Sequence, residues 1–127
     1  MNKKPLVVVV VCLAVGLAAC SSAAQETTGP RVIRGASIDT GKQLIIRYGC
    51  GTCHEIPGID GAKGLVAAPL THFGRRGTIA GRLANTPDNL IRWIENPQDV
   101  EPGTDMPNLG VSSEDARNIA AYVESLQ

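Results

Sequence analysis

The segment RYGCGTCHEIPG, residues 47–58, contains two cysteines separated by two residues, with a histidine directly after the second cysteine. Thiols and imidazoles act as nucleophiles and metal ligands, so this segment can be a redox dithiol, part of a zinc site or an attachment site for haem. A thioredoxin-like dithiol needs a βαβ context, and no strand pattern precedes Cys50. A structural zinc site needs four ligands, and beyond Cys50, Cys53 and His54 only His72 offers one.

Covalent haem attachment explains the spacing best. In a C-x-x-C-H segment the two thiols form thioethers with two vinyl groups on one edge of the porphyrin, and the adjacent histidine gives the iron a nitrogen ligand. The three groups are close in sequence because all of them bind the same porphyrin or its iron. Cys50 and Cys53 are therefore predicted to bind one haem c covalently, and His54 is predicted to be an axial ligand of its iron.

Met106 is the candidate for the sixth iron ligand. Apart from the initiator it is the only methionine of the chain, and it lies in EPGTDMPNLG, residues 101–110. Such a loop of prolines and glycines can carry a side chain over a flat cofactor, although a lone methionine more often fills an apolar core. A thioether ligand favours ferrous iron and raises the reduction potential. His72 is the rival sixth ligand.

The composition allows one small domain with a modest core. Of the 127 residues, 43% are hydrophobic but only 3% are aromatic, so large core side chains are scarce. A domain of this kind usually needs a disulfide, a metal or an embedded cofactor to be stable. The 12 Lys and Arg residues balance the 12 Asp and Glu residues, which argues against a nucleic-acid partner.

The N-terminal residues are predicted to be an export signal. A basic start with Lys3 and Lys4 precedes an apolar run over residues 6–17, which is shorter than the ~20 residues that span a bilayer. The run ends in LAAC, residues 17–20, which resembles the lipobox of bacterial lipoproteins. An ordinary signal peptide that ends in an unmodified cysteine is the alternative.

Cleavage before Cys20 removes Cys12 together with the rest of the signal peptide, residues 1–19. Cys20 is then expected to carry a lipid, and residues 20–37, which are mostly small and polar, to form a flexible tether. This places the protein on the periplasmic side of the bacterial cell envelope, anchored to a membrane. The two cysteines of the C-x-x-C-H segment alone remain in the folded part, too few for a disulfide framework.

Three helices are predicted between long loops. Residues 40–49 end in a glycine. Residues 87–95 open with Thr86-Pro87, a cap followed by proline at the first helical position, and end at Asn96-Pro97. Residues 113–126 follow a serine cap at Ser112. The last of these repeats apolar residues at i, i+3, i+4 and i+7. The connecting segments are rich in Gly and Pro and lack strand alternation. The fold class is therefore all-α, with a core that needs something further to fill its middle.

The order of these features resembles the class I cytochromes c. The helix before the C-x-x-C-H segment, the run NP…PGTDMP and the C-terminal helix IAAYVESL follow that family's order across residues 38–127. The proline-rich loops are especially similar to the cytochrome domain fused to subunit II of some haem–copper oxidases. The resemblance implies that three or more helices and long loops wrap around one covalent haem c. It also implies that Gly41 lets the first and last helices approach closely.

The resemblance implies roles for single residues as well. Met106 matches the family's axial methionine. Pro69 matches a proline whose carbonyl accepts a hydrogen bond from the ligand histidine, although Ala68 stands where the family usually has glycine. Arg75 matches an arginine that neutralises a haem propionate, with a solvated arginine pair as the alternative. Trp93 matches an aromatic residue that packs beside the haem, and ordinary core packing is its alternative role.

The predicted function is electron transfer without bond-making catalysis, because the cofactor carries the chemistry. We expect a membrane-tethered periplasmic carrier, a monomer or associated with an oxidase, that takes electrons from a respiratory complex and passes them to a terminal oxidase. One alternative is the cytochrome subunit of a periplasmic dehydrogenase. Another is a haem-based enzyme or gas sensor with a displaceable sixth ligand.

Overall fold

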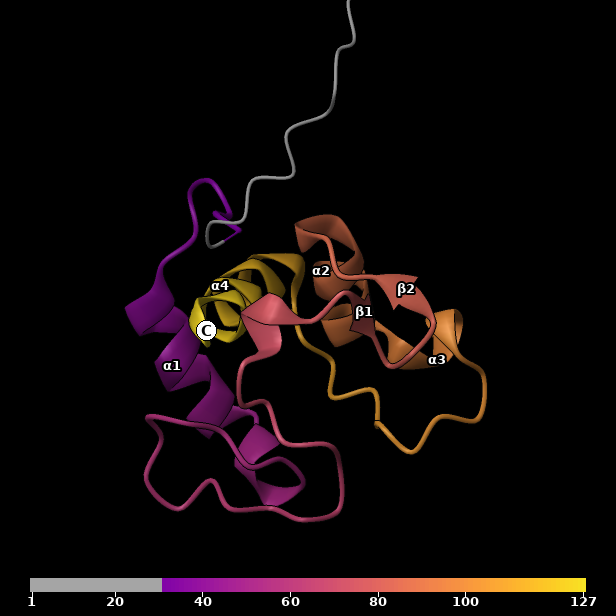
Figure 1. Cartoon of the computed structure of the whole chain (residues 1–127), viewed down its shortest axis with the longest axis horizontal. Helices are drawn as coiled ribbons and strands as arrows, with labels where there is room; N and C mark the ends of the chain where they lie inside the picture. Colours follow the sequence, from indigo (N-terminus) through magenta and orange to yellow (C-terminus); the bar gives the residue numbers. More distant parts are fainter. Residues whose placement is uncertain (1–30) are drawn as a thin grey trace, which may run out of the picture.

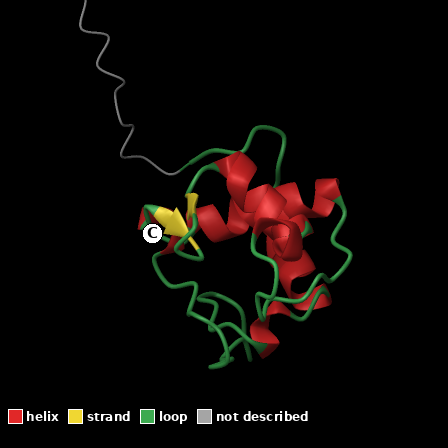
Figure 2. Cartoon of the chain, turned by 90° about the vertical axis from the view of Figure 1, so that its right-hand side faces the viewer, coloured by secondary structure: helices red, strands yellow, loops and turns green. Residues whose placement is uncertain are grey.

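The computed structural model describes residues 31–127; the predicted signal peptide, Cys20 and the start of the predicted tether lie outside them. The order of the elements is α1 Ile38–Arg47, η1 Cys50–Thr52, η2 Phe73–Arg75, β1 Thr78–Ile79, β2 Leu83–Ala84, α2 Pro87–Glu95, α3 Pro97–Val100 and α4 Ser113–Ser125. The domain is mostly helical, as predicted (Figure 1, Figure 2). Among the described residues, no helix combines the length and the apolar character needed to cross a membrane.

Side-chain caps explain where the three longer helices begin. The hydroxyl oxygens of Ser37, Thr86 and Ser112 each accept a hydrogen bond from a backbone N–H three residues later, at 3.2, 3.3 and 3.2 Å. Each bond satisfies one donor that the start of a helix leaves without an intrahelical partner. The predicted caps at Thr86 and Ser112 are confirmed. α1 begins before the predicted start at residue 40 because Ser37 caps it.

Helices α1 and α4 cross in close contact (Figure 1). At Gly41 of α1, an added Cβ atom would lie 2.0 Å from the backbone oxygen of Asn118 in α4. A side chain cannot fit there, and the predicted close approach at Gly41 is confirmed. Ile45 of α1 and Ile119 and Ala120 of α4 are buried in the same apolar core, which stabilises the crossing by removing their surface from water.

Residues 31–37, which the sequence analysis assigned to the tether, pack against the domain in the structure. Ile33 is buried in the core, and Arg31 forms an ion pair with Glu124 of α4 at 3.0 Å. Two backbone groups of this segment also form hydrogen bonds with side chains of α4. The packed domain therefore begins before residue 38. Because the segment is mostly small and polar, its composition did not indicate that Ile33 is buried in the core.

A hairpin and a short helix were not predicted. Strands β1 and β2 pair antiparallel, with Thr78 opposite Ala84, and the turn between them places Ala80 and Gly81 at φ angles of 49° and 69°. Strands of two residues are too short to show an alternating pattern in the sequence. Helix α3 starts at Pro97, directly after α2, where the sequence analysis expected only the end of a helix.

We expect Gly41→Ala to lower the free energy of unfolding by about 1–3 kcal/mol, because the added methyl group forces α1 and α4 apart. Denaturant unfolding followed by circular dichroism measures the change. Gly77→Ala is the matched control, since an added Cβ at Gly77 has nothing within 4 Å and its φ is not positive. Equal effects of the two substitutions would contradict a close contact at Gly41.

Candidate functional site

An apolar cavity of about 610 Å³, its mouth included, lies among α1, α2, α4 and the loops that join them. Its walls are almost wholly apolar, as in pockets that take small molecules and cofactors. Three lining side chains carry a sulfur or nitrogen atom that can bind a metal ion: Cys50, His54 and Met106. The remaining walls are apolar and comprise Ile45, Leu70, Phe73, Leu90, Trp93, Ile94, Pro107, Leu109, Val111, Ile119 and Val123.

The turn that follows α1 brings Cys50 and His54 to the cavity. Gly49 lies in the left-handed region at a φ of 71°, which glycine adopts without a steric cost. The N–H groups of Cys53 and His54 then both donate to the carbonyl of Cys50, at 3.3 and 3.1 Å. These bonds wind the segment into one turn. Cys50 and His54 line the cavity, whereas Cys53 is half-buried and is not among the lining residues.

The orientation of the His54 ring is fixed by a backbone carbonyl. Its Nδ1 lies 2.7 Å from the carbonyl oxygen of Ala68, whereas the carbonyl of Pro69 accepts from Arg76, so the expected role of the Pro69 carbonyl is corrected. The N–H of Ala67 donates to the carbonyl of Cys53 at 2.9 Å. This bond sets the register of the loop against the turn of residues 50–54. A proton held on Nδ1 leaves the Nε2 atom of His54 free to act as a ligand.

Met106 reaches the cavity from a loop whose backbone makes three hydrogen bonds with the Gln98 side chain. Gln98 Nε2 donates to the carbonyls of Thr104 and Met106 at 2.7 and 3.1 Å, and Gln98 Oε1 accepts from the N–H of Gly103 at 3.1 Å. Gln98 lies in α3, the helix that was not predicted. The sequence analysis therefore missed Gln98 as a residue of the site. The Asn-Pro start of α3 was the only available signal.

His72, the rival ligand, points elsewhere. It is exposed, it is not among the lining residues of the cavity, and its Nδ1 lies 2.7 Å from the backbone oxygen of Gln127. Trp93 does line the cavity and is buried, so the two roles considered for it, wall of the site and core residue, coincide. Among the two candidate sixth ligands, Met106 is the one that the fold brings to the cavity with His54.

The alternative chemistries of the cysteines find no support in this geometry. Burial raises the pKa of the Cys50 thiol, whereas a redox dithiol needs a lowered thiol pKa. In residues 31–127, no three His, Cys, Asp or Glu side chains gather into a group that could hold a metal ion. A zinc site built on this segment would need such a group.

The two neighbouring arginines of the η2 turn differ in their surroundings. Arg75 is exposed and is not among the lining residues. Arg76 is half-buried: its guanidinium lies 5.3 Å from the centre of the Phe73 ring, a wall of the cavity, and it donates to the carbonyls of Pro69 and Thr71. The predicted role of Arg75 at a haem propionate stays a prediction, and Arg76 is the arginine that contacts the cavity wall.

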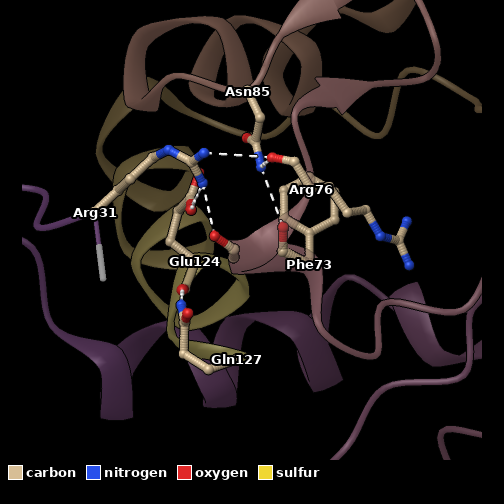
Figure 3. Close-up of polar contacts among 7 residues, drawn as sticks. Arg31, Phe73, Arg76, Asn85, Glu124 and Gln127 are labelled. Carbon is tan, nitrogen blue, oxygen red and sulfur yellow. Dashed lines mark hydrogen bonds and ion pairs between the residues drawn. The ribbon is translucent and has the colours of Figure 1, made fainter. Parts of the chain in front are cut away.

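A buried polar cluster lies at the end of α4, behind η2 (Figure 3). Glu124 is fully buried and pairs with Arg31, while its Oε1 atom has no hydrogen-bond partner within the described residues. Asn85, also buried, donates to the carbonyls of Phe73 and Arg76 at 3.1 Å each. Burial raises the pKa of Glu124 above that of an ordinary glutamate, and the interaction with Arg31 offsets this only in part.

The chain is similar in sequence to proteins of the cytochrome c family and to a part of cytochrome c oxidase subunit 2. The family described as cytochrome c matches residues 38–127 of the chain. The cytochrome c oxidase subunit 2 of Alkalihalophilus pseudofirmus is 38% identical over 89 residues, which make up 68% of this chain and 25% of that protein. The cytochrome c oxidase subunit 2 of Bacillus subtilis is 29% identical over 84 residues, 65% of this chain and 24% of that protein. The chain thus spans about a quarter of the length of these relatives.

The raised pKa of Glu124 predicts how stability depends on pH. A carboxyl group whose pKa is higher in the folded state stabilises the fold fully below its unfolded-state pKa, and this contribution is lost as the pH rises through the folded-state pKa. Relative to a Glu124→Gln variant, which does not titrate at this position, the wild-type protein should therefore lose free energy of unfolding as the pH rises from about 4, the unfolded-state pKa of a glutamate, through the raised folded-state pKa.

Denaturant unfolding at a series of pH values measures this difference. Glu114→Gln, an exposed position on the same helix, controls for the loss of one carboxylate from α4. A wild-type protein that gains stability over Glu124→Gln as the pH rises would show that the ion pair with Arg31 outweighs burial.

Proposed function

The chain belongs to the cytochrome c family, and we propose that it is an electron carrier that binds one covalent haem c in the cavity described above. The observation that carries the proposal is the convergence of Cys50, His54 and Met106 on one apolar cavity. The family implies haem c and electron transfer. The assignment of single residues to the cofactor is our inference from the donor set and the geometry.

The residues of the cavity fit such a group. The thiols of Cys50 and Cys53 lie in one turn and are free to form the two thioethers. His54 has Nε2 available because Ala68 engages Nδ1, and Met106 offers a soft thioether sulfur. A flat, largely apolar macrocycle matches walls that consist almost wholly of aliphatic and aromatic side chains.

Bound haem supplies one-electron iron chemistry. The chain's own contribution is to hold and shield it. Ala68 fixes the tautomer and orientation of His54, and Gln98 holds the loop that carries Met106. Trp93 and the apolar walls exclude water, which lowers the local dielectric and disfavours the more highly charged oxidised state. A methionine ligand acts in the same direction and raises the reduction potential.

The setting of this carrier is proposed from the sequence and from the relatives. A lipid on Cys20 after removal of residues 1–19 would anchor the protein to a membrane on the periplasmic side of a bacterial envelope. The matched relatives are named cytochrome c oxidase subunit 2. We infer that the chain accepts electrons from a respiratory complex and donates them to a terminal oxidase, either as a separate carrier or bound to it.

Mass spectrometry of the protein purified from membranes of a host that attaches haem c tests the proposal directly. We expect one haem per chain, resistant to extraction by acidified organic solvent, and an acylated N-terminus at Cys20. The Cys50→Ala/Cys53→Ala variant is the control and should carry no covalent haem. Pigment that the solvent removes from the wild-type protein would refute covalent attachment.

Spectroscopy of Met106→Ala tests the sixth ligand. We expect the wild-type protein to be low-spin, with a weak near-infrared band from sulfur-to-iron charge transfer, and the substitution to abolish the band and lower the reduction potential. His72→Ala is the control and should keep the band, because His72 is bonded to Gln127 outside the cavity. A band that survives in Met106→Ala, or a high-spin wild-type protein that binds CO rapidly, would assign the sixth position differently.

A further inference from the structure

The η2 turn, taken here as residues 72–77, forms part of the cavity wall and is held from outside the cavity. Phe73 lines the cavity, and the Arg76 guanidinium lies 5.3 Å from the centre of its ring. From the end of α4, the carbonyl of Leu126 accepts the N–H of Gly74 at 2.8 Å. An added Cβ at Gly74 would lie 2.2 Å from the backbone oxygen of Glu124, so the turn and the helix are in direct backbone contact.

Arg31 completes this hold from the other end of the described chain. Its Nη1 atom donates to the carbonyl of Gly74 at 2.8 Å and to Glu124 Oε2 at 3.0 Å, and its Nη2 atom donates to the carbonyl of Arg76 at 3.3 Å. Figure 3 shows the contacts of the Arg31 guanidinium with Glu124 and with the backbone oxygen of Arg76. One side chain thus joins the N-terminal segment, α4 and both ends of the Gly74–Arg76 backbone.

We propose that Arg31 is a positioning residue of the haem cavity, through its hold on the η2 turn. The inference rests on the proposed haem site. It extends the site to a residue that precedes the part of the chain that matches the cytochrome c family, residues 38–127. By fixing the carbonyls of Gly74 and Arg76, Arg31 fixes the cavity wall at Phe73 and the place of the neighbouring arginine side chains.

The chemistry of the contact explains why an arginine stands here. A guanidinium presents several N–H donors in a rigid plane, so it can bond two carbonyls and a carboxylate at once, whereas a lysine ammonium is a compact charge on a flexible stem. Glu124 is fully buried and orients the guanidinium. Buried ion pairs often add little net stability, since desolvation of both charges offsets their attraction. The pair is therefore better explained by the geometry that it imposes on the turn.

The test compares four haem-loaded variants with the wild-type protein: Arg31→Ala, Arg31→Lys, Arg31→Ala/Glu124→Gln and Arg34→Ala. Arg34→Ala removes the same charge from the same segment, and the Arg34 side chain is exposed with no hydrogen bond or ion pair within residues 31–127. The double variant avoids leaving Glu124 buried without its counter-ion, should Arg31→Ala fail to fold. Two readouts are taken: amide hydrogen exchange and reduction potential.

In the hydrogen-exchange measurement, the reporters are the amides of Arg75 and Arg76, which donate to the carbonyls of His72 and Phe73 inside the turn. We expect Arg31→Ala and the double variant to speed their exchange about tenfold or more, which corresponds to the loss of a hydrogen bond to a charged group. The amide of Leu90, at the start of α2, is the internal reference and should not change. Arg31→Lys should leave the turn amides fast, because an ammonium group cannot bond two carbonyls and a carboxylate in one fixed plane.

The reduction potential separates positioning from a purely structural role. A loosened turn admits water to the wall at Phe73 and favours oxidised iron, so Arg31→Ala and the double variant should have a lower potential than Arg34→Ala with Met106 ligation intact. If both variants match Arg34→Ala in potential and in exchange at the turn, the inference on Arg31 is overturned and the haem site stands. A wild-type protein without covalent haem overturns both.

Discussion

The close crossing of α1 and α4 at Gly41 is the constraint on which the rest of the structure depends. Because a Cβ at this position would lie 2.0 Å from the Asn118 backbone oxygen, the two helices meet backbone to backbone. The turn that carries Cys50 and His54 begins three residues after the end of α1, so that helix sets its position. Ile119 and Val123 of α4 line the cavity that Cys50 and His54 reach. The lack of a side chain at Gly41 thus allows the crossing that places Cys50 and His54 next to the cavity walls on α4.

Features encoded within a few residues were predictable from the sequence. The caps at Thr86 and Ser112 and the spacing of Cys50, Cys53 and His54 are local patterns, each with its own physical signature. Helix α2 has the bounds expected from its Thr-Pro start and Asn-Pro end. Met106 was singled out by its uniqueness, by its Pro/Gly loop and by the resemblance to the family's axial methionine, although which cavity it reaches depends on the tertiary fold.

Features that depend on contacts between distant segments were not predictable. The carbonyl that faces His54 belongs to Ala68 because of the register of a long loop, and residue types alone do not fix that register. The pairing of Arg31 with Glu124 joins the first described residue to the last turn of α4, and neither residue carries a sign of its partner in the sequence. Gln98 acts through backbone groups of the Met106 loop, which leave no pattern at all.

The two sides of the cavity are built with unequal rigidity. On one side, Cys50 and His54 lie in a single hydrogen-bonded turn, and the loop after it returns to bond with Cys53 and His54. On the other side, Met106 lies in a stretch whose residues are mostly exposed, and the Gln98 side chain makes three hydrogen bonds to its backbone. Segments with few buried contacts open at lower free energy than the core. For the proposed haem, a ligand set divided in this way would keep the cysteine attachment and the histidine ligand constant, while the methionine side would be the part of the site that is easiest to tune.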